Sequence, residues 1–167
     1  MHGYGRRVSV RIRSATNDDL DAIAELARES VGWHADRWPD IKQPPDAAGM
    51  RAAYADLPTG DGYYCAVAEQ DGVPVGFLTG NVSPAPEGGI ERHHGPVGYV
   101  ADVAVTAAAR RSGIATLLMN DFERWARSAG AATITLSMHA GNDAASALYR
   151  SLGFNDSWIR MRKDLSD

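Results

Sequence analysis

The sequence predicts a single α/β domain built on a mixed sheet, whose first half is mostly antiparallel and whose second half contains a parallel join. Two patterns lead to this fold class. Short segments with strand-like alternation or branched apolar residues are interspersed with segments whose apolar residues recur at three- and four-residue spacing. In addition, a chain of 167 residues has the length of one domain.

The first sixty residues predict one strand and two helices. Residues 8–13 alternate apolar with polar side chains, as a half-buried strand does. Thr16, followed three residues later by Asp19, is typical of a helix N-terminus, and one apolar face predicts a helix from there to about Ser30. Residues 31–45 contain three prolines and two tryptophans and predict a loop. A short second helix is expected over residues 46–56.

The centre of the chain predicts a hairpin. Residues 63–69 and 73–82 have the composition of strands, and the dipeptide Asp71-Gly72 between them suits a two-residue turn with positive φ. Residues 83–96, with three prolines and three glycines, predict a mobile loop.

The second half predicts a parallel join. A valine-rich strand, a helix, a further strand and a last helix are expected in turn over residues 97–105, 112–128, 131–138 and 142–152. The strands on either side of the first of these helices would be parallel. From Phe154 the chain is expected to return as a strand pair or an extended tail. About four helices would therefore flank the sheet.

Composition excludes several classes of protein. Hydrophobic residues at 44% and charged residues at 23% are typical of a soluble globular chain, and no apolar run approaches the ~20 residues of a membrane helix. A net charge of −4 gives no sign of nucleic-acid binding. The single cysteine, Cys65, cannot by itself form an internal disulfide or a zinc site. We therefore expect a cytoplasmic protein with no metal and no nucleic-acid or membrane partner.

The first informative motif is Arg110-Arg111-Ser112-Gly113-Ile114-Ala115, where a strand runs through a turn into a helix. Free backbone N–H groups and the positive dipole end make a helix N-terminus suitable for an anion. Gly113 and Ala115 allow close approach, and two arginines add positive charge. The alternative interpretation is an ordinary strand-to-helix turn with solvated arginines.

The second informative stretch is residues 135–154, in which Asn142 begins a helix and Tyr149 follows on one face of it. Taken alone, Asn142 is explained as an N-cap and Tyr149 as an aromatic residue at the edge of the core.

Together, the two stretches resemble the GNAT superfamily of acetyl-CoA-dependent N-acetyltransferases. The first matches the family's Arg/Gln-x-x-Gly-x-Gly/Ala turn. The second matches its Asn-x-x-Ala-x-x-Leu-Tyr-x-x-x-Gly-Phe segment, here Asn142, Ala145, Leu148, Tyr149, Gly153 and Phe154. The resemblance covers about residues 97–156, the expected cofactor-binding core of one N-acetyltransferase domain over residues 1–167. Residues 16–60, which carry no motif, are expected on the acceptor side.

The resemblance implies roles for particular residues. Strand amides would bind the pantetheine arm and thioester carbonyl of acetyl-CoA, the cosubstrate. Amides of the turn would surround the pyrophosphate. These cofactor-binding residues are Val103, Ala104, Val105, Arg110, Arg111, Ser112, Gly113, Ile114, Ala115 and Thr116. Asn142 would contact the pantetheine or phosphate arm, and Tyr149 would face the sulfur and protonate the leaving thiolate.

A base is also needed, because an amine attacks the acetyl carbonyl only in its neutral form. Asp102, on the strand that would face the acetyl group, is our candidate, acting directly or through water. The alternative is a carboxylate that is merely exposed or that holds an arginine. His139 is a second candidate. Some relatives carry a glutamate where this chain has Ser137, which argues against the arrangement of enzymes that acetylate protein N-termini.

The family's fold would form the acceptor pocket from residues 31–45, residues 83–96 and the chain end. The first segment contains Trp33, His34, Asp36 and Trp38, and rings with carboxylates suit a cationic amine. A packed loop with solvated acids would explain them equally well.

We expect acetyl transfer to a primary amine of a small molecule by direct attack on the thioester. Residues 99–116 look broadly similar to those of aminoglycoside acetyltransferases. Acetylation of a protein lysine or N-terminus, or a non-catalytic acyl-CoA-binding module, are the alternatives. A homodimer is expected from the habit of the family.

Overall fold

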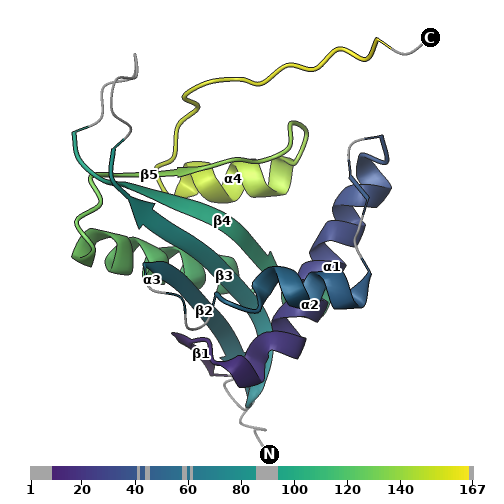
Figure 1. Cartoon of the computed structure of the whole chain (residues 1–167), viewed down its shortest axis with the longest axis vertical. Helices are drawn as coiled ribbons and strands as arrows, with labels where there is room; N and C mark the ends of the chain where they lie inside the picture. Colours follow the sequence, from purple (N-terminus) through teal and green to yellow (C-terminus); the bar gives the residue numbers. More distant parts are fainter. Residues whose placement is uncertain are drawn as a thin grey trace, which may run out of the picture. The chain divides into compact units, whose positions relative to one another are not determined.

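The computed structural model describes residues 9–40, 42–43, 46–57, 60, 62–85 and 94–165 (Figure 1). Contacts within the chain divide it into two units, Met1–Ser137 and Met138–Asp167, which we describe separately. The strands and α-helices described in the first unit are β1 (Val10–Ser14), α1 (Leu20–Arg37), α2 (Ala47–Tyr54), β2 (Tyr63–Gln70), β3 (Val73–Ser83), β4 (Val97–Val105), α3 (Ile114–Ser128) and β5 (Thr133–Leu136). The second unit contains α4 (Asp143–Ser151).

In the described residues, the strands form one five-stranded sheet in the order β1-β2-β3-β4-β5. The first three pairings are antiparallel, and β4 pairs with β5 in parallel. Asp71 and Gly72 have φ values of 51° and 84° in the turn between β2 and β3, as a tight hairpin requires. The predicted mixed sheet, hairpin and parallel join are therefore confirmed.

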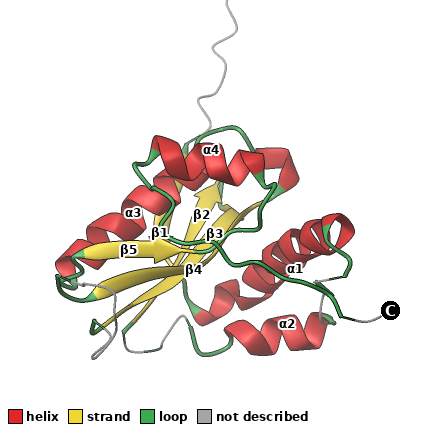
Figure 2. Ribbon diagram, turned by 90° about the horizontal axis from the view of Figure 1, so that it is seen from above, coloured by secondary structure: helices red, strands yellow, loops and turns green. Residues whose placement is uncertain are grey.

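Helices cover both faces of the sheet (Figure 2). On one face, α1 and α2 pack against β2 and β3, and Ile23, Met50 and Phe77 are nearly inaccessible to solvent there. On the other face, α3 inserts Phe122, which is 0% exposed. The apolar face that predicted α1 corresponds to its buried residues. In α3, Ile114, Leu118 and Phe122 of the predicted apolar face are buried, whereas Leu117 is 44% exposed. Packing of these faces supplies most of the helices' stability.

Gly80 allows α3 to approach the sheet closely. A Cβ atom at this position of β3 would lie 2.6 Å from the Phe122 ring and 2.5 Å from the Tyr99 carbonyl oxygen. The Phe122 ring also contacts Tyr64 and Trp125, with centroid separations of 5.3 and 5.6 Å. This packing fixes the position of α3, whose N-terminus follows β4 in the chain.

The first helix is longer than predicted. α1 continues through Arg37, so residues 31–37 of the predicted loop, including Trp33, are helical. Pro39 explains the end point, because a residue before proline is disfavoured in the helical region, and Trp38 has φ −134° and ψ 63°. Residues 41 and 44–45 of the expected loop lie outside the described residues.

Other boundaries also differ from the predictions. α3 begins at Ile114 rather than at residue 112, because Arg111 and Gly113 have left-handed φ values of 63° and 83°. β5 is shorter than the predicted 131–138. Residues 154–165 contain no strand, in agreement with an extended tail rather than a strand pair. Residue 8, which was expected in the first strand, and residues 86–93 of the expected loop lie outside the described residues.

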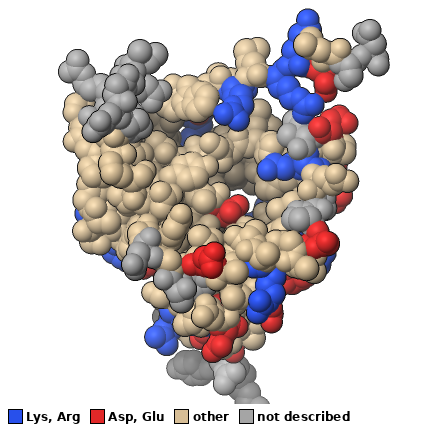
Figure 3. Space-filling view, in the orientation of Figure 1, with Lys and Arg blue, Asp and Glu red and all other residues tan. Residues whose placement is uncertain are grey.

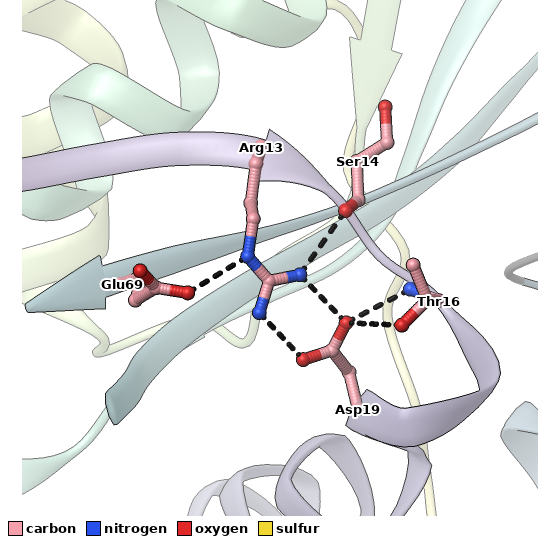
Figure 4. A network of polar contacts seen from close by, with 5 residues as sticks. All are labelled: Arg13, Ser14, Thr16, Asp19 and Glu69. Atoms are coloured by element: carbon pink, nitrogen blue, oxygen red, sulfur yellow. Dashed lines mark hydrogen bonds and ion pairs between the residues drawn. The ribbon is translucent and has the colours of Figure 1, made fainter. Parts of the chain in front are cut away.

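The start of α1 is fixed to the sheet by a buried carboxylate (Figure 4). Arg13 of β1 donates from Nη1 and Nη2 to the two oxygens of Asp19 at 2.7 and 2.8 Å, and from Nε to Glu69 of β2 at 2.8 Å. Asp19, which is 5% exposed, also accepts a hydrogen bond from the Thr16 backbone N–H at 2.8 Å. The predicted pairing of Thr16 and Asp19 at a helix start is confirmed.

Asp19→Asn is expected to lower the free energy of unfolding by about 2 kcal/mol at pH 7, because a charge-assisted hydrogen bond contributes about 1.5–3 kcal/mol. The Arg13 guanidinium holds the pKa of Asp19 below its ordinary value of 3.8. The carboxylate's contribution is therefore complete above the unfolded-state pKa and is lost as pH falls toward the lower folded-state pKa. Urea unfolding at several pH values measures it.

The matched control is Asp18→Asn, which changes the exposed neighbour of Asp19. This control should leave the unfolding free energy within about 0.5 kcal/mol of the parent. The difference between Asp19→Asn and the parent should narrow below about pH 4, where the carboxylate of the unfolded parent chain becomes protonated while that of the folded protein is still ionised. A difference that is constant down to about pH 2, or that is equal for both variants, would contradict this account.

Candidate active site

A β-bulge in β4 determines which way Asp102 points. Thr79 of β3 pairs with Asp102 but Gly80 pairs with Val100, so Ala101 is an extra residue in β4. The bulge places Asp102 on the same face of the sheet as Thr79, the face that α2 covers. Asp102 is exposed to solvent, and its Oδ2 atom accepts a hydrogen bond from the Tyr54 hydroxyl at 3.2 Å.

Tyr54, the last residue of α2, is 8% exposed and packs edge-on against Phe77 with ring centroids 5.6 Å apart. Burial, reinforced by the adjacent charge of Asp102, raises the pKa of Tyr54 well above its usual value. The phenol therefore remains protonated at neutral pH and donates to the Asp102 carboxylate. Tyr54 was not among the predicted site residues, because in the sequence it is recognisable only as an aromatic residue of a short helix.

Thr79 adds a second polar group beside Asp102. It is 1% exposed, and its Oγ1 has no hydrogen-bond partner among the described residues. A buried hydroxyl without a partner costs about 1–3 kcal/mol, so a polar residue at this place is unexpected in a purely structural sheet. Thr79 pairs with Cys65 in the neighbouring strand β2. Cys65 is a core thiol, and burial raises its pKa to about 11.

β4 extends beyond the end of its pairing with β5. The parallel register covers Val97–Val100 of β4 and ends with Leu136, where β5 ends. β4 continues to Val105, and over residues 101–105 its described strand partner is β3. The segment that contains Val103, Ala104 and Val105 therefore offers backbone groups to which an extended, amide-bearing ligand can hydrogen-bond.

β4 leads into an exposed turn before α3. Arg111, Ser112 and Gly113 are exposed, and a Cβ atom at Gly113 would meet nothing within 4 Å. The first N–H groups of a helix have no intrahelical acceptor, and glycine offers no side chain to cap them. The amides at the start of α3, from Ile114 to Thr116, therefore lie at the positive end of a helix with open space beside Gly113.

The two arginines of the turn differ in their contacts. Arg110 is engaged within the protein: its Nη2 atom lies 3.1 Å from Glu29 Oε1, and its Nε atom donates to the Val105 carbonyl at 3.0 Å. Arg111 is exposed and has a left-handed backbone. Both remain predicted cofactor-binding residues, and Arg111 is the more accessible of the two.

The aromatic acceptor-site candidates gather at the C-terminal end of α1. His34 stacks on Trp38 with centroids 5.7 Å apart, and Trp33 meets the His34 ring edge-on at 5.0 Å. Trp33 remains 39% exposed, and Asp36 is also exposed. The structure thus brings the three rings together at the end of a helix, where the sequence predicts a loop.

Acidic and basic side chains pair on the surface of α1 and α2, as Asp21 with Arg51 and Glu25 with Arg28. Figure 3 shows Asp and Glu side chains in the lower part of the view, where Figure 1, in the same orientation, shows the start of α1 and α2.

The described residues contain no group of three or more His, Cys, Asp or Glu side chains arranged to hold a metal ion. Every helix in the described chain is too short or too polar to cross a bilayer.

The remaining candidates belong to the second unit. Asn142 caps α4, with its Oδ1 atom accepting from the Ala145 N–H at 3.2 Å, as the sequence predicted. Tyr149 is half-buried and meets the Phe154 ring at 5.9 Å. His139 precedes α4 in this unit. The roles of Asn142, Tyr149 and His139 at the site therefore stay predictions.

Comparisons with known proteins identify relatives of the chain. A 62-residue stretch is 36% identical to aminoglycoside N(6')-acetyltransferase type 1 of Acinetobacter haemolyticus. The match spans 37% of this chain and 43% of that protein, less than half of either.

Solved structures match over nearly the whole chain. A mutant of the BH1408 protein from Bacillus halodurans has a TM-score of 0.86 at 20% identity and covers 93% of this chain and 99% of its own. Aminoglycoside N-acetyltransferase AAC(6')-Iy in complex with CoA has a TM-score of 0.69 at 18% identity, with coverages of 96% and 98%. These likenesses concern the fold. A profile described as "Acetyltransferase (GNAT) family" matches residues 21–154, so the chain belongs to this family.

Proposed function

We propose that the protein transfers an acetyl group from acetyl-CoA to a primary amine of a small molecule. The observation that carries this proposal is the continuity of one segment. Asp102, the end of β4 at Val103–Val105 beyond its pairing with β5, and the exposed turn at Gly113 follow one another from β4 into α3. A carboxylate, a row of backbone groups and an anion-binding helix end are the parts that an acetyl thioester with a pyrophosphate arm requires.

Acetyl-CoA supplies the activated acetyl group. Amides of the turn, from Arg111 to Thr116, would hold the pyrophosphate, and the edge of β4 would hydrogen-bond the pantetheine arm. Amides of the same edge would stabilise the oxyanion that develops on the acetyl carbonyl. The residues present fit these requirements, because glycine at position 113 keeps the approach to the first amides of α3 open.

Asp102 would take the proton that the attacking amine loses, directly or through a water. The amine nitrogen then forms a bond to the acetyl carbon, the carbon–sulfur bond breaks, and the CoA thiolate leaves and accepts a proton, for which Tyr149 is the proposed donor. The hydrogen bond from Tyr54 is made to Oδ2 of Asp102, and Oδ1 would take this proton. Tyr54 would thus orient the base.

For the acceptor, we propose a small, cationic amine. The rings of Trp33, His34 and Trp38 and the exposed Asp36 suit such a group through cation–π and charge contacts. The relative from Acinetobacter haemolyticus is an aminoglycoside acetyltransferase, and this likeness supports a polyamine or amino sugar.

Binding of acetyl-CoA should raise the thermal midpoint of the protein. At ~100 times the dissociation constant, a ligand adds about 2.7 kcal/mol to stability. For a chain of this size the expected rise is roughly 5–10 °C. Gly113→Asp should abolish the rise, because a carboxylate would then stand beside the amides proposed to hold the pyrophosphate.

Gly130→Asp is the matched control. Gly130 lies just beyond the other end of α3, has φ +85° against +83° for Gly113, and likewise has open space within 4 Å of the place that a Cβ atom would take. Both variants carry the same backbone strain and the same added charge, so they differ only in the end of α3 at which the new carboxylate lies. A rise that survives in Gly113→Asp, or that is missing in the parent protein, would contradict the proposed cofactor site.

A further inference from the structure

Glu29 of α1 reaches across to the segment between β4 and α3. Its Oε1 atom accepts from the Ala107 backbone N–H at 2.7 Å and from Arg110 Nη2 at 3.1 Å. Its Oε2 atom accepts from the Thr106 hydroxyl at 2.9 Å. One carboxylate therefore binds three donors, in a segment almost eighty residues further along the chain.

The same segment is also tied to the sheet. The Thr106 N–H donates to the Val75 carbonyl at 2.9 Å, and Arg110 Nε donates to the Val105 carbonyl. The turn that leads to Gly113 is thus held between β3 and α1. Because hydrogen bonds to a carboxylate are charge-assisted, this attachment is stronger than that of an ordinary loop.

The charge of Glu29 has the wrong sign for an anion site. A carboxylate near bound phosphates repels them, and pairing with Glu29 also offsets the positive charge of Arg110. Electrostatics alone therefore predicts that removing the charge tightens binding of an anion. If Glu29 instead fixes the backbone, removing its charge should weaken anion binding, because the amides of the turn then lose their preset direction.

We propose that Glu29 is a positioning residue for the cofactor turn, holding the segment from Thr106 to Arg110 so that the following amides of α3 point at one place. The proposal rests on the proposed function for its ligand, CoA. It extends that function to α1, because a residue on the acceptor-side helix then determines affinity for the cofactor. Glu29 touches no reacting atom, and its effect passes through the turn.

The test compares Glu29→Gln with Glu25→Gln, one turn earlier on the same helix. Glu25 is exposed and pairs with Arg28 at 2.6 Å, so the control also removes a paired carboxylate from α1. Amide hydrogen exchange is measured over residues 106–116 in the free, full-length protein, and the dissociation constant of CoA is measured by calorimetry. Thr106→Val, which removes one donor, is the second variant if Glu29→Gln does not fold.

We expect exchange of the Ala107 amide to accelerate by roughly tenfold or more in Glu29→Gln and CoA to bind roughly tenfold to a hundredfold more weakly. Glu25→Gln should change neither quantity, and Thr106→Val should change both in the same direction but less. Unchanged exchange, or tighter CoA binding in Glu29→Gln, would overturn the positioning role. Absence of CoA binding in the parent protein, with Ala107 protected, would instead overturn the proposed function.

Discussion

Asp102→Asn is expected to lower the rate of acetyl transfer by about 10²–10⁴-fold, the contribution of a positioned general base. The substitution keeps the size of the side chain and its ability to accept from the Tyr54 hydroxyl. It removes only the group that would take a proton from the attacking amine. Initial rates of thiol release from acetyl-CoA, with an aminoglycoside such as neamine as acceptor, measure this effect.

Two controls separate base chemistry from general damage. Asp71→Asn changes an exposed acid in the turn between β2 and β3, at a position with φ 51° that asparagine tolerates, and should leave the rate unchanged. Tyr54→Phe removes the hydrogen bond to Asp102 but not the carboxylate, so its effect should be smaller, on the order of tenfold. A rate in Asp102→Asn within about twofold of the parent's, at equal CoA affinity, would contradict the assignment.

Phe122→Ala is expected to lower the free energy of unfolding by about 3–5 kcal/mol, the range for truncating a buried phenylalanine. Phe122 is 0% exposed and its ring lies against Gly80, Tyr64 and Trp125. These neighbours belong to the sheet and to α3 itself, so they cannot easily close the cavity. Since the total stability of a domain is only about 5–15 kcal/mol, this single change threatens the fold.

Leu117→Ala is the matched control, since Leu117 is on the same helix and 44% exposed. Urea unfolding should show a loss for this control of well under half that for Phe122→Ala, because less apolar area is withdrawn from burial. A loss below about 1 kcal/mol for Phe122→Ala would show that α3 is not held to the sheet in the way described.

Local signals predicted the elements that depend on neighbouring residues. Asp71-Gly72 predicted its hairpin because both φ values are positive there, and the turn around Gly113 lies between a strand and a helix as its motif required. The end of α1 was placed too early. The tryptophans and prolines of residues 31–45 predict a loop, but the helix continues until Pro39 makes the preceding residue non-helical.

Contacts between distant residues were beyond the reach of such signals. The bulge at Ala101 depends on how β4 pairs with β3, and the sequence of β4 is that of an uninterrupted strand. Tyr54 donates a hydrogen bond to Asp102, 48 positions away, and Glu29 accepts one from Ala107, 78 positions away. Each of the two belongs to a helix that carries no motif. The sequence therefore predicted the candidate base and the turn, whereas their supporting residues required the fold.

Acetyl transfer from acetyl-CoA to a small amine is the central claim, and mass spectrometry of the products tests it most directly. The purified protein is incubated with acetyl-CoA and a panel of amines that includes neamine, a linear polyamine and a lysine-containing peptide. We expect an acetylated small amine, formed together with free CoA and at a greatly reduced rate in Asp102→Asn. Acetylation of the peptide alone, or CoA release without an acetylated amine, would contradict the claim.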